Sequence, residues 1–132
     1  MSESPKAPTE RELEILKVLW DLGEGSVRQV HERLAPDRGI VQSTVQAFLR
    51  TMETKGLVSH RVDGRSFLYR ATQDRAETER GLVGGLLDRA FDGAIDQLVA
   101  RALDVRQPPA EALQELRRLL DRAEQKERGE AP

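Results

Sequence analysis

Residues 25–34 read GSVRQVHERL and residues 41–72 read VQSTVQAFLRTMETKGLVSHRVDGRSFLYRAT, and these two runs decide the fold. Their apolar spacing predicts two helices joined by a turn at residues 36–39, where the sequence is Pro-Asp-Arg-Gly. Two strand-like runs follow, and the Asp63-Gly64 pair between them indicates a tight hairpin, because glycine accepts a positive φ at no steric cost. This order of elements is that of a winged helix-turn-helix, in which the second helix enters the major groove of DNA and the hairpin forms the wing.

The ends of the first two helices carry local signals. Thr9 and Glu12 have the spacing of a capping box, which predicts a first helix that begins there and ends at Gly23. Ser26 is expected to cap the second helix, which reaches Leu34.

The third helix is expected to be capped by Gln42 or Ser43, to reach about Lys55 and to stop at Gly56. Its predicted buried stripe consists of Val45, Phe48, Leu49 and Met52. Its predicted exposed face carries Ser43, Gln46, Ala47, Arg50 and Thr54. The strands of the hairpin are predicted over residues 57–62 and 66–70.

Positive charge is concentrated on this part of the chain. The 132 residues have a net charge of −2, yet residues 38–73 hold six arginine or lysine residues and two acidic ones, a net charge of +4. The rest of the chain therefore sums to −6, so the cations gather on the segment that would face phosphate. These cations are Arg38, Arg50, Lys55, Arg61, Arg65 and Arg70.

Three amphipathic helices are predicted in the C-terminal part of the chain, over residues 74–90, 94–103 and 110–126. Three glycines interrupt the first of them, and each costs about 0.5–1 kcal/mol relative to alanine. Such short helices can hardly cover their own apolar stripes, so we expect them to pack against the same helices of a second chain. The expected interface residues are Leu82, Leu86, Phe91, Ile95, Leu98, Val99, Leu103, Leu113, Leu116 and Leu120.

The expected fold is mainly α with a small β-hairpin: a winged helix-turn-helix followed by a helical dimerisation region. The expected domain organisation is a flexible arm over residues 1–8, a winged-helix DNA-binding domain over 9–73, a helical dimerisation region over 74–126 and a frayed tail over 127–132.

Composition argues against several other classes of protein. Without cysteine the chain has no disulfide, no thiolate zinc site and no thiol nucleophile, which fits a reducing compartment. No apolar run approaches the roughly 18–20 residues that cross a bilayer and no secretory signal is visible, so a cytoplasmic protein without a membrane partner is expected. His31 and His60 lack ligand spacing, so no metal is expected. No catalytic set or phosphate loop is recognisable, so neither enzyme activity nor a cofactor is expected.

Four motifs carry a resemblance that spans the chain from about Thr9 to Leu120. They are TERELEILKVLW at 9–20, STVQAFLRTMETKGLV at 43–58, DGRSFLYRAT at 63–72 and FDGAIDQLV at 91–99. Together they resemble the penicillinase-repressor (BlaI/MecI/CopY) family of bacterial winged-helix transcriptional regulators. The resemblance implies a homodimeric repressor that binds double-stranded DNA at an inverted-repeat operator and is released by a signal.

Position by position, the resemblance assigns DNA contacts to Ser43, Thr44, Gln46 and Arg50 of the recognition helix and to Arg65 at the wing. Ala47 stands where the family usually has threonine, and an alanine can still touch a thymine methyl group.

The resemblance also implies two routes of release. In antibiotic-responsive members a regulatory protease cuts a region that corresponds to residues 98–103, around Arg101 and Ala102, although the Asn-Phe pair found there is missing from this chain. In copper-responsive members metal binds C-terminal cysteines, and the absence of cysteine argues against that branch.

The chemistry of these residues supports contact with DNA, and each of them also has a simpler interpretation. Gln46 and Arg50 lie one turn apart, so both reach one groove, where glutamine can bond adenine and arginine can bond guanine. Lys55 and Arg61 are expected to add non-specific attraction to phosphate. The simpler interpretations are a solvated charge for Arg50, a capping role for Ser43 and Thr44, and a solvated turn residue for Arg65.

Two other functions stay open. A winged helix can serve protein–protein assembly alone, and the net charge of +4 over residues 38–73 argues against that use. An effector-sensing winged-helix regulator would need a ligand pocket between the C-terminal helices and the DNA-binding domain.

Overall fold

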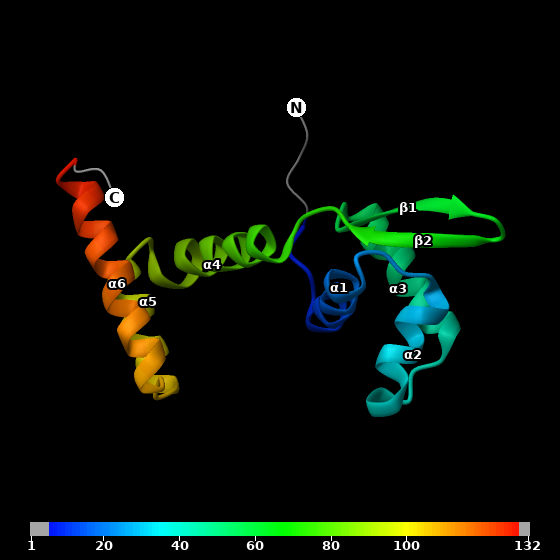
Figure 1. The fold of residues 1–132 in the computed structure, drawn as a ribbon, viewed down its shortest axis with the longest axis horizontal. Helices are drawn as coiled ribbons and strands as arrows, with labels where there is room; N and C mark the ends of the chain where they lie inside the picture. Colours follow the sequence, from blue (N-terminus) through cyan, green and yellow to red (C-terminus); the bar gives the residue numbers. More distant parts are fainter. Residues whose placement is uncertain (1–5, 130–132) are drawn as a thin grey trace. The chain divides into compact units, whose positions relative to one another are not determined.

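The computed structural model describes residues 6–129, apart from the side chains of residues 35–38. Its elements, in chain order, are α1 (Glu10–Leu22), α2 (Val27–Arg38), α3 (Gln42–Thr54), β1 (Val58–Asp63), β2 (Ser66–Ala71), α4 (Arg75–Phe91), α5 (Ile95–Val105) and α6 (Ala110–Glu127) (Figure 1). The expected order of elements is therefore confirmed, as a mainly helical chain with one antiparallel hairpin.

The chain divides into two compact units, an N-terminal unit over Met1–Gly85 and a C-terminal unit over Leu86–Pro132. The division falls inside α4, whereas the predicted domain boundary follows residue 73. The functional bounds 9–73 and 74–126 stay a prediction. Of the expected arm, residues 1–5 lie outside the described part of the chain, as do residues 130–132 of the expected tail. Glu127, expected to be frayed, is the last residue of α6.

The capping box predicted for α1 is confirmed. The backbone N–H of Glu12 donates to the Thr9 hydroxyl at 3.2 Å, and the N–H of Thr9 donates to the Glu12 carboxylate at 2.9 Å. Gly23 ends the helix with φ 83°. Two unsatisfied donors of the first turn thus find partners close to each other in the sequence, which is why the start could be predicted.

The start of α2 agrees with the sequence and its end does not. Ser26 and Gln29 form a second reciprocal pair, because the N–H of Gln29 donates to the Ser26 hydroxyl at 3.1 Å and the N–H of Ser26 to the Gln29 side chain at 2.8 Å. The predicted end at Leu34 and the predicted turn from residue 36 are wrong, since α2 continues to Arg38 and the backbone turns at Gly39, where φ is 61°. A proline in the last turn removes one N–H, but its fixed φ is itself helical.

The predicted cap of α3 is also wrong. Val41 is the N-cap, in an extended conformation, and no side chain caps the helix within the described residues. Gln42 and Ser43 therefore belong to the first helical turn. The predicted stop at Gly56 holds, because φ is 85° there and the N–H of Leu57 donates to the carbonyl of Met52 at 2.9 Å.

The hairpin pairs Val58 with Ala71 at its base and Asp63 with Ser66 at its tip, so Gly64 and Arg65 form a two-residue loop. A φ of 63° at Gly64 fits the first central position of a type II′ turn. The predicted bounds of both strands differ from the observed ones by one residue. β1 spans Val58–Asp63 where residues 57–62 were predicted, and β2 spans Ser66–Ala71 where residues 66–70 were predicted.

An isolated bridge joins this hairpin to the turn before α2. The N–H of Gly25 donates to the carbonyl of Tyr69 at 2.9 Å, and the N–H of Tyr69 donates back at 2.8 Å. This bridge fastens the wing to the helix-turn-helix, and no local pattern in the sequence predicts it.

The core of the N-terminal unit draws on α1, α2, α3 and the hairpin. Its buried members are Ile15, Leu16, Leu19, Val30, Leu34, Val45, Leu49, Met52, Leu57, Val58 and Tyr69. Three of the four residues predicted for the buried stripe of α3 are among them, and Phe48 packs at the edge. This core turns the other face of α3 to solvent, and that face carries the candidate site.

The C-terminal unit differs, because neither α5 nor α6 contains a buried residue. No helix in the described part of the chain is long and apolar enough to cross a membrane.

Candidate nucleic-acid interface

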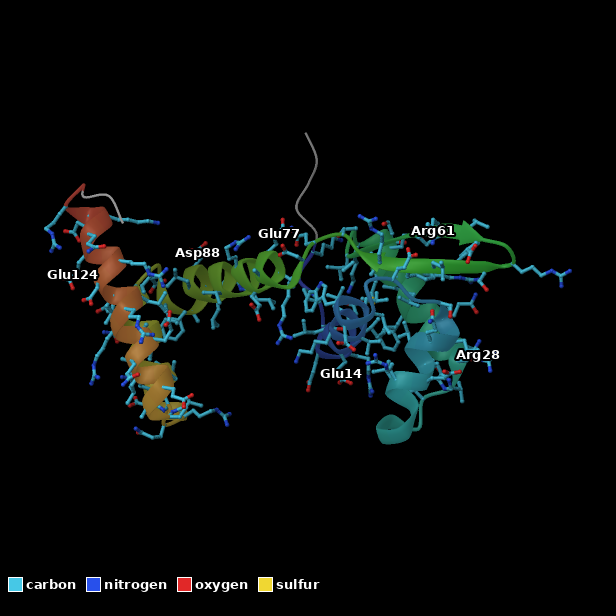
Figure 2. All side chains as sticks on the ribbon, viewed as in Figure 1. Glu14, Arg28, Arg61, Glu77, Asp88 and Glu124 are labelled. Carbon is cyan, nitrogen blue, oxygen red and sulfur yellow. The ribbon has the colours of Figure 1, made fainter. Side chains whose placement is uncertain are left out.

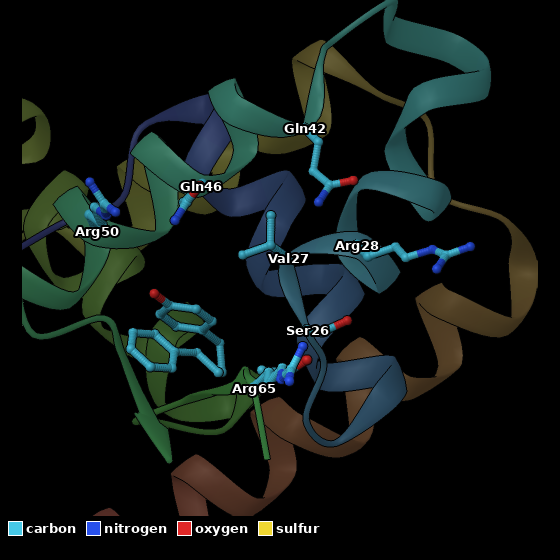
Figure 3. Close-up of a pocket in the computed structure, with 10 residues that line it drawn as sticks. Ser26, Val27, Arg28, Gln42, Gln46, Arg50 and Arg65 are labelled. Atoms are coloured by element: carbon cyan, nitrogen blue, oxygen red, sulfur yellow. The ribbon is translucent and has the colours of Figure 1, made fainter. Parts of the chain in front are cut away.

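A concave surface of about 440 Å³ lies between the start of α2, the exposed face of α3 and the hairpin. Its polar side chains come from all three elements and include Ser26, Arg28, Gln42, Gln46, Arg50 and Arg65 (Figure 3). The rings of Phe67 and Tyr69 also line it. We call this region the concave surface.

The exposed face of α3 is the one that the sequence predicted. Burial of Val45, Leu49 and Met52 anchors the helix, and the predicted polar face lies in solvent. Of the expected contact residues on this helix, Gln46 and Arg50 line the concave surface, whereas Ser43, Thr44 and Ala47 are exposed beside it.

The N-terminus of α3 offers backbone donors to a ligand. No side chain caps it within the described residues, and the first N–H groups of an α-helix have no partner inside the helix. The N–H of Thr44 makes a tight turn bond to the carbonyl of Val41 at 3.0 Å. The positive end of the helix dipole adds to these donors, so this end favours an anion such as phosphate.

The expected cationic contacts fall into two groups. Arg50 and Arg65 are exposed, line the concave surface and form no ion pair within residues 6–129. Lys55 and Arg61 do not line that surface, and each is paired with a carboxylate. The structure thus brings together two of the four cations and separates the other two from them.

Lys55 neutralises a buried carboxylate. Its ammonium lies 2.9 Å from both oxygens of Glu12, whose side chain is 2 % exposed. Burial raises the pKa of Glu12, but the hydrogen bonds and charge of Lys55 and the hydrogen bonds of Thr9 outweigh it, so the pKa lies below its ordinary value. Lys55 therefore holds α1 to the end of α3.

Arg61 of β1, labelled in Figure 2, is paired with Glu24. Its guanidinium donates two hydrogen bonds to that carboxylate, at 2.6 and 3.2 Å. These bonds lower the pKa of Glu24 and raise the pKa of Arg61. The pair joins β1 to the turn between α1 and α2.

Sequence reasoning missed Arg28 and Phe67 as residues of the site. Arg28 is exposed at the start of α2 and lies 3.0 Å from Glu32, one turn along the helix. The fold brings Arg28 to the same surface as α3. The one sequence signal for such a role is its position in the first turn of the helix that Ser26 caps. Phe67 was assigned to a strand, with no indication of the surface that it lines.

Both histidines have partners in the fold. The His31 Nε2 atom lies 2.6 Å from the carbonyl of Ile40, and the His60 Nδ1 atom lies 2.7 Å from the Glu53 carboxylate. Within residues 6–129, no group of three or more histidine, cysteine, aspartate or glutamate side chains is arranged to hold a metal ion.

The expected interface residues divide by exposure. Leu86, Ile95, Val99, Leu103 and Leu120 are exposed. Leu82, Phe91, Leu98, Leu113 and Leu116 are half-buried. Arg101 and Ala102, in the region expected to be cut, are exposed within the regular helix α5, and Arg101 pairs with Asp104 at 3.3 Å.

Comparisons with known proteins point in one direction. The family model described as Penicillinase repressor matches residues 8–122. The penicillinase repressor of Bacillus licheniformis is 26% identical over 113 residues, which cover 86% of this chain and 88% of that protein. The transcriptional regulator BlaI of Mycobacterium tuberculosis is 33% identical over 84 residues, 63% of this chain and 61% of that protein. The solution structure of the DNA binding domain of the repressor BlaI matches with a TM-score of 0.51 at 27% identity, over 58% of this chain and 93% of that one.

Proposed function

The chain belongs to the penicillinase repressor family, and we propose that it represses transcription as a homodimer bound to an inverted-repeat operator. Family membership and the likeness to the DNA binding domain of BlaI support a DNA-binding transcriptional repressor. The dimer, the symmetry of the operator and the contacts described below are the proposal.

The observation that carries the proposal is the pair of unpaired arginines on the concave surface. Arg50 projects from α3 and Arg65 from the tip of the hairpin, with Gln46 on α3 beside them (Figure 3). A recognition helix and a wing that present free cations to one surface suit a ligand with regularly spaced phosphates.

Each residue then has a role set by its chemistry. Gln46 reads adenine and Arg50 reads guanine in the major groove, each pair contributing roughly 1–3 kcal/mol of discrimination. Arg65 contacts phosphate or the adjacent minor groove beneath the wing. Ser43 and Thr44 bring the free N-terminus of α3 to a phosphate, and Ala47 touches a thymine methyl group.

Lys55 and Arg61 have a smaller part in this proposal. Both charges are compensated by a carboxylate, so they raise the general attraction to phosphate little and specify no base. Arg28 also lines the concave surface, but its charge is compensated by Glu32 in the same way.

The C-terminal helices supply the second half of the proposal. Their apolar side chains include Ile95 at 64 % exposure and Leu120 at 63 %. An isologous contact between two such chains covers these side chains, and its two-fold axis presents two recognition helices to two half-sites. Occupancy of the operator then blocks the access of RNA polymerase.

Release by a protease belongs to the proposal as well. A cut between Arg101 and Ala102 would detach the end of α5 and all of α6, and with them much of the apolar surface that holds the dimer. The mass of the chain isolated from antibiotic-treated cells tests this step, and a mass unchanged from full length contradicts it.

The experiment for the whole proposal is selection of bound sequences from random duplex DNA, with the purified chain and with Arg50→Ala in parallel. We expect the native chain to enrich an inverted repeat that the variant does not enrich. No enrichment, together with weak binding that vanishes near physiological salt, would contradict the proposal and favour a module for protein–protein assembly.

A further inference from the structure

We propose that His60 is a positioning residue, which fixes the wing against the recognition helix by joining Glu53 of α3 to Phe67 of β2. This inference rests on the proposed function, because it concerns how the wing is held where DNA would bind. The residues next to His60 in the sequence do not indicate this role.

The distal part of the hairpin has no core behind it. In β1, Val58 is buried and Arg61 and the residues after it are exposed. In β2, Tyr69 is buried near the base and Phe67 is 46 % exposed. A lone two-stranded hairpin is marginally stable in water, so the direction of the tip depends on side-chain contacts near its base.

His60 makes such a contact on the inner face of the hairpin. Its Nδ1 atom lies 2.7 and 2.9 Å from the two oxygens of the Glu53 carboxylate. An ionised carboxylate can only accept, so the Nδ1–H group of His60 donates the hydrogen bond that both oxygens share. Glu53 lies one turn after Arg50 on the helix that would enter the groove.

His60 also holds the aromatic wall of the concave surface. Its ring stacks on Phe67 with 4.2 Å between the centroids and 18° between the planes. Tyr69 lies 5.4 Å from His60 and 6.5 Å from Phe67, so the buried phenol ring supports both. Glu53, His60 and Phe67 thus form one continuous link from α3 to the strand β2, whose Phe67 lines the concave surface.

A second contact fastens the other face of the strand. Successive residues of a strand point to opposite faces, and Arg61, next to His60, is paired with Glu24. Arg61 is exposed and Glu24 is half-buried, and neither residue lines the concave surface. Of these two contacts, only the inner link joins the hairpin to α3.

The consequence concerns Arg65, at the tip of the hairpin. If the inner link sets the direction of the wing, its loss weakens the contact that Arg65 makes and leaves the contact of Arg50 intact, because Arg50 is carried by α3 itself. His60 would then be energetically coupled to Arg65 and independent of Arg50.

A double-mutant cycle tests the coupling, with a duplex that carries the sequence enriched by the native chain. His60→Phe keeps an aromatic ring beside Phe67 and removes the donor to Glu53. We expect Arg65→Ala to lower affinity about tenfold in the native background and less than about twofold in the His60→Phe background. Arg50→Ala should cost the same factor in both backgrounds. Equal costs of Arg65→Ala in the two backgrounds would overturn the inference.

Two variants at Glu53 separate the effect of its negative charge from the effect of its hydrogen bond to His60. Glu53→Gln and Glu53→Ala both delete a negative charge near the DNA, but only glutamine keeps an oxygen that accepts from His60. The inference expects Glu53→Gln to keep the coupling and Glu53→Ala to abolish it. Ser59→Ala, on the same strand and exposed, is the control that should change neither value.

A measurement without DNA separates this inference from the proposed function. The nuclear Overhauser effect of the Arg65 amide in the free, full-length protein reports the mobility of the wing. We expect His60→Phe and Glu53→Ala to make that amide more mobile, and Ser59→Ala and Glu53→Gln to leave it unchanged. An unchanged amide in all four variants overturns the inference, whereas failure of the native chain to select any sequence overturns the proposed function alone.

Discussion

The two units of this chain share the regular apolar spacing of amphipathic helices but differ in how much of that apolar surface is buried. In the N-terminal unit, helices with regular apolar spacing meet one another and a hairpin, and eleven of the described apolar side chains are buried. In the C-terminal unit, α5 and α6 have equally regular apolar faces and not one buried residue. Amphipathic spacing therefore predicts a helix in both units, but it predicts a filled core only where the chain supplies the facing surface.

Helix α4, inside which the two units meet, also has positions with no facing surface in the described part of the chain. Alanine would be a better helix former than Gly81 or Gly84, yet an added Cβ at either position would meet no neighbouring atom within 4 Å among residues 6–129, outside the helix's own backbone. No neighbour in the part of the chain that the structure describes requires these glycines. The comparison predicts that the N-terminal unit is stable by itself and that the C-terminal unit depends on a second copy.

The largest expected effect is in the core of the N-terminal unit. Leu49→Ala removes a fully buried side chain and should lower the free energy of unfolding by about 2–5 kcal/mol. Chemical denaturation at several protein concentrations checks this, and the loss should be the same at each. Leu120→Ala is the matched control in α6; a comparable, concentration-independent loss there would break the comparison.

The next effect is on association through the C-terminal helices. Ile95→Asp places a charge on the apolar face of α5 and should raise the dissociation constant of the dimer more than about a hundredfold, because burial of an unpaired charge costs several kcal/mol. Gln97→Asp adds the same charge in the same turn on the polar face, and it should leave the constant within about twofold. Light scattering over a dilution series measures both, and equal effects of the two aspartates would refute the assigned face.

A smaller effect separates the two groups of cations in the N-terminal unit. Arg50→Ala should reduce affinity for the selected duplex more than about tenfold, because a free arginine on the concave surface is lost. Arg61→Ala should cost less, because its charge is already compensated by Glu24. Fluorescence anisotropy titrations, with thermal unfolding to show that both variants fold, provide the test. A larger loss for Arg61→Ala would reverse the assignment of the site.

The smallest effect is a dependence of stability on pH that belongs to the N-terminal unit. The pKa of Glu12 is lower in the folded chain than its ordinary value of 4.5, so its ionisation stabilises the fold above that value. This contribution should be lost as the pH falls from 4.5 through the lowered pKa. Denaturation curves of Glu12→Gln should show a shallower loss over the same range. An equal slope in both proteins would contradict the role of the Glu12–Lys55 pair.

Sequence reasoning found the parts of the N-terminal unit that local chemistry determines. The Thr9 capping box, the stop at Gly56 and the exposed face of α3 follow from residues close together in the chain. The start of α3 could not be found in this way, because Val41 makes no capping bond that a sequence would reveal. The extension of α2 past Leu34 differs from the prediction because the Pro-Asp-Arg-Gly sequence at residues 36–39 is typical of a turn, yet the helix continues through it to Arg38.

The candidate site was predictable to the same extent. Gln46 and Arg50 share a helix face, so periodicity alone was sufficient to group them. Lys55 and Arg61 could not be separated from the free cations, since their partners lie 43 and 37 residues away in the chain. Contacts at such sequence separation leave no local pattern, and only the fold identifies them.

The mass of the full chain in solution tests the central claim most directly. Sedimentation equilibrium across a range of concentrations should give about twice the 14.8 kDa of one chain at the higher concentrations, with dissociation on dilution. That result would mean that the exposed faces of α5 and α6 are covered by a second copy. A mass of 14.8 kDa at every concentration, together with a mass of one chain per selected duplex in the complex, would contradict dimerisation.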